Sequence, residues 1–315
     1  MKIVIYDVLG FSNNDIAKIR SVASDATVVV SAEEDLAIEL KDAEVFFGYH
    51  TPEVFADADQ LKWIQATAAG MDVLLSPEVK ARNILVTNAS GVHAPQVAEM
   101  AWALTLSIAR GVALYVKQQR EHHWEWGPLY DIDGQTAGVI GLGGIGRRYA
   151  RVAAAFGMKV LAVDAHAVSA PDFVDSLWGM DRLDELIERA DVILTSCPYT
   201  DETHHLINAE RIAKMKPTAI VVNIARGGII DEDALSVALL EGRIAGAGID
   251  VCETEPLPSD SPLWDVPNLV VTPHCGGLGP ARMGRLAQFF CENLRRYLDA
   301  EPLRNVVDQE KGYPV

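Results

Sequence analysis

Cysteine is scarce in this chain of 315 residues. The four thiols, Cys197, Cys252, Cys275 and Cys291, form no Cys-x-x-Cys pair, and a chain of this length needs no covalent cross-links to fold. We therefore expect reduced thiols, which are typical of a cytoplasmic protein. The first residues resemble a β-strand rather than the apolar core of a signal peptide, which favours the same location.

The chain also has few basic residues relative to acidic ones, and it has no long apolar run. Lys and Arg number 27 against 44 Asp and Glu, a net charge of −17. Nucleic acids and anionic membranes are bound through basic surfaces, so we expect neither as a partner. The longest apolar run, 100–109, ends at Arg110 and is too short to cross a bilayer. The apolar fraction of 49% is ordinary for a globular protein and excludes extensive disorder.

No repeat, low-complexity tract or flexible linker divides the chain, but its length suggests two domains. Short β-branched runs alternate with helical segments, which predicts parallel sheets, because a parallel crossover needs a helix-sized connection. The first expected strands are Ile3–Tyr6, Thr27–Val30, Val45–Phe47, Trp63–Gln65 and Leu85–Thr87. A second series is Gly138–Gly141, Val160–Asp164, Val192–Ser196, Ile220–Ile224, Gly248–Val251 and Leu269–Thr272.

Two long helical patterns flank the second strand series. One runs from Ala94 to about Arg120, and the other, which is amphipathic, from about Ala281 to Ala300. We expect the second helix to return to the first domain, so that the chain crosses twice. The expected domains are 1–93 with 277–315 for substrate binding, and 94–276 for dinucleotide binding.

A glycine-rich motif, Gly141-Leu142-Gly143-Gly144-Ile145-Gly146, lies between an apolar strand and a helix. In such a motif the first glycine allows a tight turn, the second lets backbone N–H groups approach a pyrophosphate, and the third permits close helix–strand packing. The helix N-terminus adds unpaired N–H groups for the phosphates. A glycine-rich turn that binds nothing is the alternative, but the strand, the helix and a following acid favour a dinucleotide site.

That acid, Asp164, ends the next expected strand. A carboxylate there can accept hydrogen bonds from a ribose 2′-hydroxyl and would repel a 2′-phosphate. No Arg or Lys follows in residues 165–168 to hold such a phosphate. The sequence therefore predicts NAD as the cofactor.

Three polar residues follow strand ends in the second series: Arg226, Glu255 and His274. Ligands of open parallel sheets bind outside the carboxyl ends of the strands, where all three would project. A guanidinium suits a substrate carboxylate, and a His beside a Glu makes a proton donor. Singly, each residue is as consistent with a salt bridge or a loop cap. Together they match reduction of a 2-keto acid by hydride.

These motifs resemble those of the D-isomer-specific 2-hydroxyacid dehydrogenases, which include glyoxylate/hydroxypyruvate reductases, D-lactate dehydrogenases and phosphoglycerate dehydrogenases. The resemblance covers nearly the whole chain and is carried by Gly141–Gly146, Pro198–Thr203, Asn223–Gly228, Asp250–Pro256 and Thr272–His274. It implies an α/β fold with two parallel-sheet domains, one Rossmann and one flavodoxin-like. It also implies NAD-dependent hydride transfer between nicotinamide and C2 of a small D-2-hydroxy acid or 2-keto acid.

The resemblance assigns roles to matching residues of the second domain. Arg226 would bind and polarise the keto acid, His274 would be the general acid/base, and Glu255 would pair with His274. Further positions would line the cofactor: Pro198 and Thr203 on the adenosine side, Ile224, Ala225 and Asp250 near the nicotinamide, and also Gly276 and Gly277.

In the first domain, the resemblance implies that the loop Ala68–Asp72 holds the substrate carboxylate through backbone N–H groups, those of Ala69 and Gly70. The loop 48–51, with Tyr49 and His50, would shape the pocket. No Arg or Lys cluster occurs in these two loops, which favours an unphosphorylated substrate.

We expect no metal, because neither His122-His123 nor His204-His205 is completed by further ligands at suitable spacing. A reactive thiol at Cys275 is not favoured, since only His274 is a basic neighbour. The helix from Ala94 is apolar on nearly all faces, which predicts burial on nearly all sides. Together with the family's habit of pairing through this region, it favours a homodimer.

Two alternatives stay open. A short-form phosphoglycerate dehydrogenase would share these motifs, although many such enzymes carry a C-terminal regulatory domain for which a chain ending at Val315 has no room. A non-catalytic NAD-sensing protein, like the corepressors that resemble this family, would keep the dinucleotide motif without turnover. Retention of Arg226, Glu255 and His274 together favours the enzyme.

Overall fold

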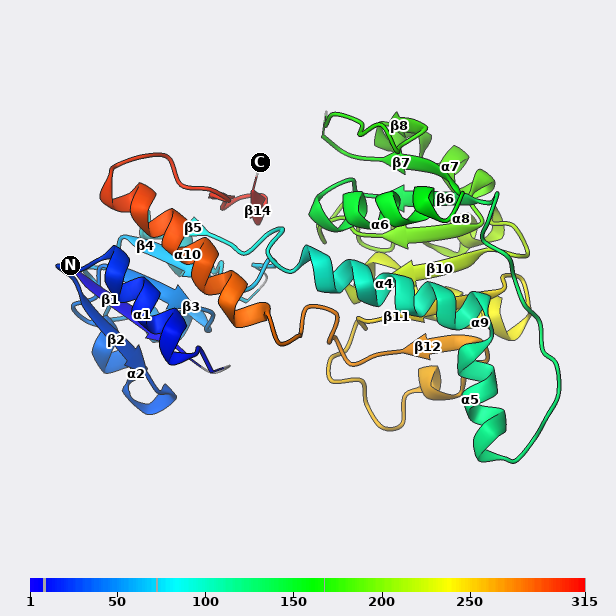
Figure 1. The fold of residues 1–315 in the computed structure, drawn as a ribbon, viewed down its shortest axis with the longest axis horizontal. Coiled ribbons are helices and arrows are strands. Elements are labelled where there is room, and N and C mark those ends of the chain that lie inside the picture. Colours follow the sequence, from blue (N-terminus) through cyan, green and yellow to red (C-terminus); the bar gives the residue numbers. More distant parts are fainter. Residues whose placement is uncertain (8–9, 72, 167, 315) are drawn as a thin grey trace. The chain divides into compact units, whose positions relative to one another are not determined.

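The computed structural model describes residues 1–7, 10–71, 73–166 and 168–314, which form two compact units (Figure 1). Unit 1 comprises Met1–His93 and Gly279–Val315, and unit 2 comprises Ala94–Leu278. The return to unit 1 thus falls two residues later than expected. The reason is local, because the Leu278 N–H donates to the Cys275 carbonyl (2.9 Å) and closes a turn that stays with unit 2.

Unit 1 is built on a five-stranded parallel sheet of order β2-β1-β3-β4-β5, the flavodoxin-like order. The strands are β1 (Lys2–Tyr6), β2 (Thr27–Ser31), β3 (Val45–Gly48), β4 (Trp63–Ala66) and β5 (Leu85–Thr87). The helices are α1 (Asn13–Val22), α2 (Glu33–Leu40), η1 (Pro52–Phe55), α3 (Pro77–Ala81) and α10 (Arg282–Leu298). A short ribbon of β13 (Val307–Asp308) and β14 (Tyr313–Pro314) follows α10.

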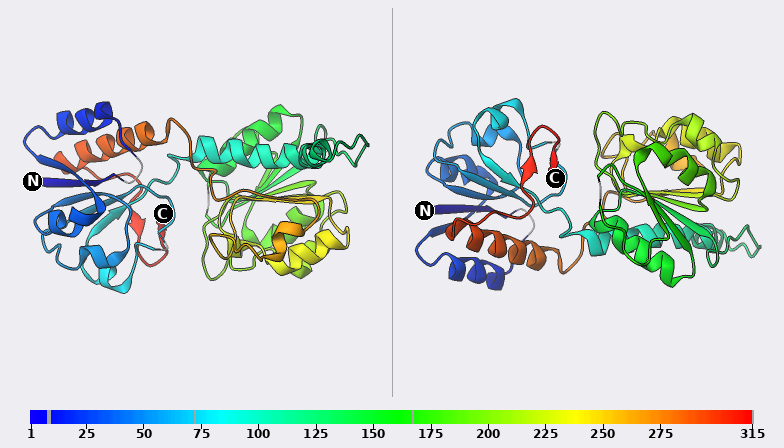
Figure 2. Two further views of the ribbon diagram at one scale, coloured as in Figure 1. Left: turned by 90° about the horizontal axis from the view of Figure 1, so that it is seen from below. Right: turned by 90° about the horizontal axis from the view of Figure 1, so that it is seen from above.

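Apolar side chains point to both faces of this sheet in turn along β1, and each face is covered by a separate buried cluster. Ile3 and Ile5 join a buried cluster with Phe290 of α10, whereas Val4 joins a different cluster. Figure 2 shows α1 and α10 together on one face. Phe290 stacks on Phe47 of β3 with ring centroids 4.2 Å apart. Because α10 completes this core, residues after 279 belong to unit 1 although they follow unit 2 in the chain.

Unit 2 contains a seven-stranded parallel sheet of order β12-β11-β10-β9-β6-β7-β8, the Rossmann order extended by one strand. The strands are β6 (Thr136–Ile140), β7 (Lys159–Val163), β8 (Ser176–Trp178), β9 (Val192–Thr195), β10 (Ile220–Asn223), β11 (Gly246–Ile249) and β12 (Leu269–Val271). The helices are α4 (Ala94–Ala109), α5 (Val112–Arg120), α6 (Gly144–Ala155), η2 (Met180–Arg182), α7 (Leu183–Arg189), α8 (Ala209–Ala213), η3 (Gly227–Ile229), α9 (Glu232–Leu240) and η4 (Pro262–Asp265). The predicted α/β fold with a Rossmann and a flavodoxin-like sheet is confirmed.

Two local expectations were wrong. The helix expected over 94–120 breaks after α4, because Gly111 adopts a left-handed conformation (φ +63°) that starts the separate helix α5. Strand β8 was missed, since it is three residues long and only half-buried. Among the described helices, none alone is long and apolar enough to span a membrane. The α4–α5 pair reaches that length and composition only jointly, and it is bent by 66°.

Candidate active site

The glycine-rich turn joins β6 to α6, and its three motif glycines have different surroundings. Gly141 has φ +92°, and a Cβ there would lie 2.8 Å from the Cys197 backbone nitrogen. A Cβ on Gly146 would lie 2.1 Å from the Gly141 carbonyl oxygen. Gly143 is exposed, and a Cβ there would meet no atom within 4 Å. Gly141 and Gly146 are thus required by packing, whereas Gly143 leaves the helix N-terminus open to a phosphate group.

Asp164 follows β7 and links its loop to the glycine-rich turn. Its Oδ2 accepts a hydrogen bond from the Leu142 N–H (2.7 Å), and its Oδ1 accepts one from the His166 N–H (2.9 Å). A basic side chain from α6 also contacts the loop after β7, and the residues that follow Asp164 gave no sign of it. Arg147, in the first turn of α6, donates from Nη2 to the Ser169 carbonyl (2.8 Å).

His274 and Glu255 are brought together at the carboxyl ends of β11 and β12. The His274 Nδ1 lies 2.7 Å from Glu255 Oε2, and Glu255 Oε1 accepts from the Cys252 N–H (3.0 Å). Because an ionised carboxylate only accepts, Nδ1 carries the proton of the neutral ring and Nε2 is left as the basic nitrogen. The two side chains are 47% and 37% exposed, so small molecules can reach them.

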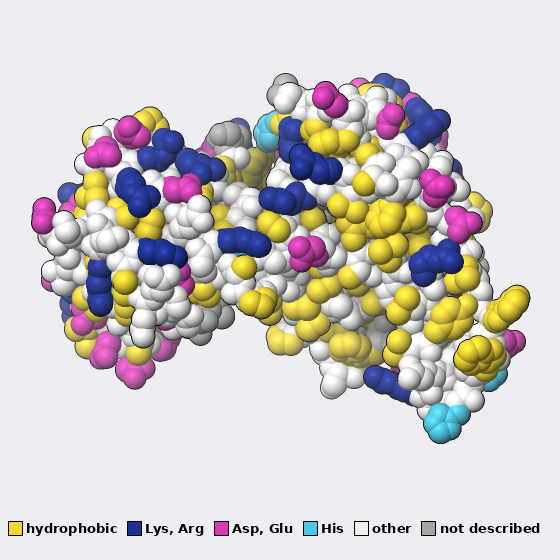
Figure 3. All heavy atoms as spheres, viewed as in Figure 1, with side chains coloured by type: hydrophobic (Ala, Val, Ile, Leu, Met, Phe, Trp, Pro, Cys, Tyr) yellow, Lys and Arg dark blue, Asp and Glu magenta, His cyan; other side chains and the backbone are white. Residues whose placement is uncertain are grey.

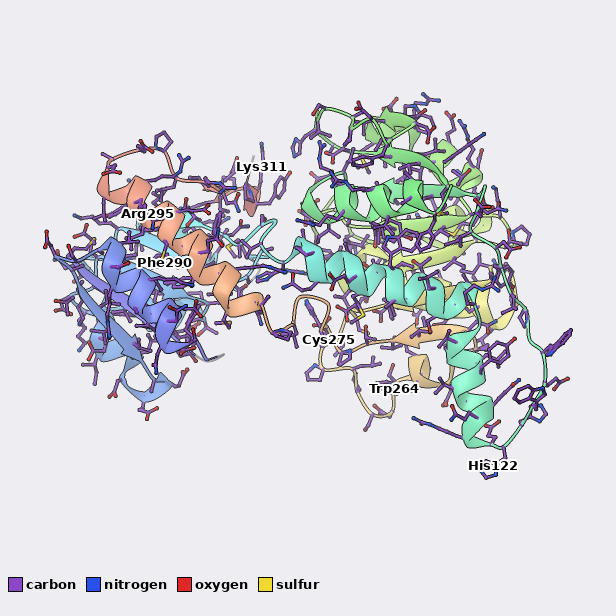
Figure 4. All side chains as sticks on the ribbon, viewed as in Figure 1. His122, Trp264, Cys275, Phe290, Arg295 and Lys311 are labelled. Carbon is purple, nitrogen blue, oxygen red and sulfur yellow. The ribbon has the colours of Figure 1, made fainter. Side chains whose placement is uncertain are left out.

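Asp250 holds the loop that carries His274. This buried carboxylate accepts hydrogen bonds from Thr272 Oγ1 (2.6 Å), the Cys275 N–H (3.0 Å) and the Gly276 N–H (2.8 Å). The His274 N–H donates to the Asp250 carbonyl (2.8 Å), and His274 itself has φ +48°. Figure 4 labels Cys275 in this loop after β12. Asp250 therefore fixes the loop geometry from which the imidazole projects.

Arg226 begins a turn that packs tightly against the loop containing Glu255. Its carbonyl accepts from Asn223 Nδ2 (2.8 Å), and its Nη1 donates to the Ala225 carbonyl (2.8 Å). A Cβ on Gly227 would lie 2.0 Å from the Cys252 carbonyl carbon, so only glycine permits this approach. The half-buried guanidinium is thus held at the carboxyl end of β10.

The remaining predicted cofactor residues lie at the same sheet edge of unit 2. Thr203 Oγ1 donates to the Pro198 carbonyl (2.8 Å), which ties these two predicted positions together. Ile224 is buried directly after β10, with Ala225 beside it. Gly277 lies in the turn that Leu278 closes.

In unit 1, the segment 67–70 presents an edge of backbone N–H groups. The Ala68 carbonyl accepts from the Ala89 N–H (2.8 Å), and the Ala69 carbonyl accepts from Asn88 Nδ2 (2.6 Å). The Thr67 carbonyl lies 3.1 Å from His93 Nε2. No described residue accepts from the N–H of Ala69 or Gly70. The carbonyls of residues 67–69 are thus held by contacts with residues 88–93, and the N–H groups of Ala69 and Gly70 are available as donors.

Tyr49 and His50 follow β3 in the same unit. The Tyr49 hydroxyl accepts from the Val73 N–H (3.4 Å), and His50 Nε2 lies 3.0 Å from Glu33 Oε1. Glu33 also contacts the Tyr6 hydroxyl, and this hydrogen bond raises the pKa of Tyr6 to about 12. His50 is therefore half-buried and anchored rather than freely rotating.

The thiols and histidines add no further chemistry to this site. Burial raises the pKa of Cys275, and it raises the pKa of Cys197 to about 12, so neither is an activated thiolate at neutral pH. Within the described residues, no three His, Cys, Asp or Glu side chains form a group able to hold a metal ion.

Comparison with known proteins identifies the family. Residues 102–276 match the model of the "D-isomer specific 2-hydroxyacid dehydrogenase, NAD binding domain". A glyoxylate reductase of Korarchaeum cryptofilum is 39% identical over 266 residues, covering 82% of this chain and 79% of that protein. This chain belongs to the D-isomer specific 2-hydroxyacid dehydrogenases. It is an oxidoreductase, and NAD(H) is its cofactor.

Other members of the family match the chain over nearly its whole length. A hydroxypyruvate reductase of Blautia hydrogenotrophica is 33% identical over 326 residues, covering 98% of this chain and all of that protein. A solved family member from Aeromonas salmonicida has a TM-score of 0.83 and 32% identity, covering 98% of this chain and 99% of that one. The resemblance drawn from the motifs is therefore confirmed for the family, fold and cofactor.

Proposed function

We propose that this dehydrogenase interconverts a small 2-keto acid and its D-2-hydroxy acid, with the site residues in the roles set out below. The observation that carries the proposal is the pair of His274 Nδ1 and Glu255 Oε2 at 2.7 Å. NAD(H), when bound, supplies or accepts the hydride at substrate C2. The chain must then supply a proton donor for the substrate oxygen and a partner for the carboxylate.

His274 supplies the proton. Glu255 accepts the hydrogen bond from Nδ1–H, so the ring is oriented with Nε2 available to the substrate oxygen. In the oxidative direction Nε2 takes the proton back. Asp250 has a positioning role, because its contacts hold the 272–276 loop.

Arg226 binds the substrate carboxylate, since a guanidinium matches two carboxylate oxygens with two N–H donors. The N–H groups of Ala69 and Gly70 donate to the carboxylate as well, and their freedom from described acceptors supports this role. Tyr49 and His50 shape the space for the substrate's side chain.

The open space at Gly143 fits a pyrophosphate, and the Leu142–Asp164 hydrogen bond places the Asp164 carboxylate beside that turn. Asp164 there accepts hydrogen bonds from the adenosine ribose, which favours NADH over NADPH. Pro198 and Thr203 line the adenosine side, while Ile224, Ala225, Asp250, Gly276 and Gly277 lie toward the nicotinamide.

The decisive experiment is NADH oxidation, followed by absorbance, with a panel of 2-keto acids from glyoxylate and hydroxypyruvate to larger side chains. We expect turnover with at least one of them and a D-configured product by chiral chromatography. NADH binding without oxidation by any panel member would instead support the non-catalytic sensor.

We further propose a homodimer that forms through α5 and the segment after it. Trp124 and Trp126 are 95% and 91% exposed, and Val112 and Val116 of α5 are about half-exposed. Figure 3 shows hydrophobic side chains gathered over α4 and α5. So large an apolar surface favours a second copy as its cover.

Light scattering at micromolar concentration tests this pairing. We expect about twice the monomer mass of 34.2 kDa for the wild type, and a shift toward monomer for the double variant Trp124→Ser, Trp126→Ser. A wild-type mass near 34.2 kDa would contradict the dimer.

A further inference from the structure

Helix α10 of unit 1 begins with two arginines whose buried donors lack partners. Arg282 Nε and Arg285 Nη1 are fully buried without a hydrogen bond. Neither guanidinium forms an ion pair with any described carboxylate. The first turn of α10 contains no acid, and its N-cap residue Ala281 provides no side-chain hydrogen bond.

This arrangement is unfavourable as it stands. A buried charged donor without a partner costs free energy, because it has lost its hydration without replacement. The N-terminus of a helix carries partial positive charge, so cations in its first turn are repelled. A bound anion would relieve both costs at once.

His93 is a third group with an unpartnered buried atom. Its Nε2 lies 3.1 Å from the Thr67 carbonyl, so Nε2–H is the donor and Nδ1, which is buried and has no partner, holds the lone pair. Burial, reinforced by the positive charges of Arg282 and Arg285, lowers the pKa of His93. An anion would favour the imidazolium and so convert Nδ1 into a donor.

A carboxylate close to the first turn of α10, that of Asp15, is already engaged. Asp15 Oδ1 lies 3.9 Å from the position of a Cβ on Gly284. Asp15 Oδ2 accepts from Ser12 Oγ (2.6 Å), and Oδ1 pairs with Lys18 Nζ (3.6 Å). Asp15 is therefore not the missing counterion of the two arginines.

The position of this cluster relates it to the substrate. His93 binds the carbonyl of Thr67, and the donors that we propose for the keto-acid carboxylate belong to Ala69 and Gly70. Two residues of extended chain span about 7 Å, which is comparable to the length of a small diacid. One substrate can therefore place an acidic group at each end of this segment.

We propose that His93, Arg282 and Arg285 form a binding site for a second acidic group of the 2-keto acid, a carboxylate or a phosphate. This proposal rests on the proposed function and names its substrate class. It differs from the expectation drawn from loops 48–51 and 68–72, where no basic cluster occurs, because the arginines come from a helix more than 200 residues further along the chain.

The test compares kcat/KM, at saturating NADH, for three kinds of substrate. Hydroxypyruvate has a neutral end, oxaloacetate and 2-oxoglutarate have a second carboxylate, and 3-phosphohydroxypyruvate has a phosphate. The variants are Arg282→Met and Arg285→Met. Arg295→Met is the matched control, because Arg295 is an exposed arginine further along the same helix (Figure 4).

We expect the wild type to prefer a doubly acidic substrate. A preference for oxaloacetate or 2-oxoglutarate would indicate a carboxylate site, and a preference for 3-phosphohydroxypyruvate would indicate a phosphate site. Each test variant should lose about 10- to 100-fold in kcat/KM for that substrate, the effect of one hydrogen bond to a charged group. Its kcat/KM for hydroxypyruvate should stay within about twofold. Arg295→Met should behave as wild type, and Arg285→Lys should recover part of the loss because the charge returns.

Two results would overturn the proposal: a wild type without preference for doubly acidic substrates, or equal losses on all substrates, which indicate a structural role. Circular dichroism and thermal unfolding confirm that each variant folds. Titration of the enzyme with inorganic phosphate by calorimetry is independent of turnover. If no 2-keto acid is reduced, the proposed function fails, while phosphate binding that is lost in Arg282→Met and Arg285→Met still supports the anion site.

Discussion

The two units expose backbone N–H groups by opposite means. In unit 2, the turn 141–146 does so by lacking side chains, since Gly143 leaves space that a Cβ would occupy. In unit 1, the segment 67–70 contains ordinary residues, and its carbonyls are instead bound by groups from 88–93. A glycine turn admits a bulky pyrophosphate, whereas a tethered segment presents a fixed edge to a small carboxylate.

The charges around the two functional regions differ as well. The His274 imidazole in unit 2 faces the Glu255 carboxylate, with Nδ1 2.7 Å from Oε2. His93 in unit 1 lies beside Arg282 and Arg285, which disfavour a proton on its imidazole. A histidine thus lies beside an acidic residue in unit 2 and beside two basic residues in unit 1, which suits different chemistry at the two places.

The largest expected effect concerns His274 itself. His274→Ala should lower kcat by about 10²- to 10⁴-fold, because a positioned acid/base is removed. The Kd for NADH, measured by fluorescence, should change little, since the glycine-rich turn is untouched. Near-normal turnover would show that the proton comes from another group.

The glycine turn offers a matched pair of substitutions. Gly146→Ala should destabilise unit 2 by about 3 kcal/mol or more, because its Cβ would lie 2.1 Å from a backbone oxygen. Gly143→Ala should leave the thermal unfolding temperature nearly unchanged and raise the Kd for NADH by about tenfold, because its Cβ enters only the open space at the turn. Unchanged NADH binding in folded Gly143→Ala would contradict the pyrophosphate site.

Asp164 tests the cofactor preference of the same turn. Asp164→Ala should reduce the ratio of kcat/KM for NADH over NADPH by about tenfold, since it removes both the ribose acceptor and the repulsion of a 2′-phosphate. Arg147, held at the Ser169 carbonyl, is the nearby cation that could then favour NADPH.

The control for this substitution is Asp164→Asn, which keeps one acceptor for the Leu142 or His166 N–H and so separates turn stability from cofactor choice. A wild type that uses both cofactors equally would contradict the ribose role.

Asn88 tests the tethered segment of unit 1. Asn88→Ala frees the Ala69 carbonyl and should raise KM for the keto acid by up to about tenfold, because the N–H edge loses its fixed orientation. The Kd for NADH should stay constant, as this residue belongs to the other unit. A rise in both the KM for the keto acid and the Kd for NADH would indicate a general loss of structure rather than the loss of the Asn88–Ala69 hydrogen bond.

The contrast between the units also explains how much could be predicted from sequence. The glycine turn, Asp164 and the Arg226, Glu255 and His274 positions carry local signals, because each follows an apolar strand. Buried strands rich in β-branched residues, such as β10, were likewise predictable. The break at Gly111 was not, since a glycine within an apolar helical pattern is often tolerated.

The anion cluster of unit 1 could not be found in this way. His93 and Arg285 are far apart in the chain, and each looks ordinary in its own segment. Only the packing of α10 on the sheet, through Phe290 and Phe47, brings the arginines close to His93. Sites assembled by tertiary packing have no local pattern to reveal them.

The smallest expected effect tests the acidic surroundings of unit 2. Partial burial, with the charges of Glu253, Asp233 and Glu255, raises the pKa of Glu232, whose Oε1 accepts the Glu253 N–H (2.7 Å). A raised pKa means that the unfolded chain ionises first as pH increases. Stability is therefore lost as pH rises from about 4.5 through the folded-state pKa.

Glu232→Gln keeps the acceptor oxygen and removes the charge, so it should stabilise the protein at pH 7 by about 0.5 kcal/mol, the scale of partly exposed substitutions. The gain should vanish below pH 4.5, where Glu232 is protonated in both states. Thermal unfolding of wild type and variant from pH 4 to 8 measures this difference. A variant less stable than wild type at pH 7 would mean that the Glu232 charge supports the loop of Glu255, and that the carboxylates of unit 2 cooperate rather than repel.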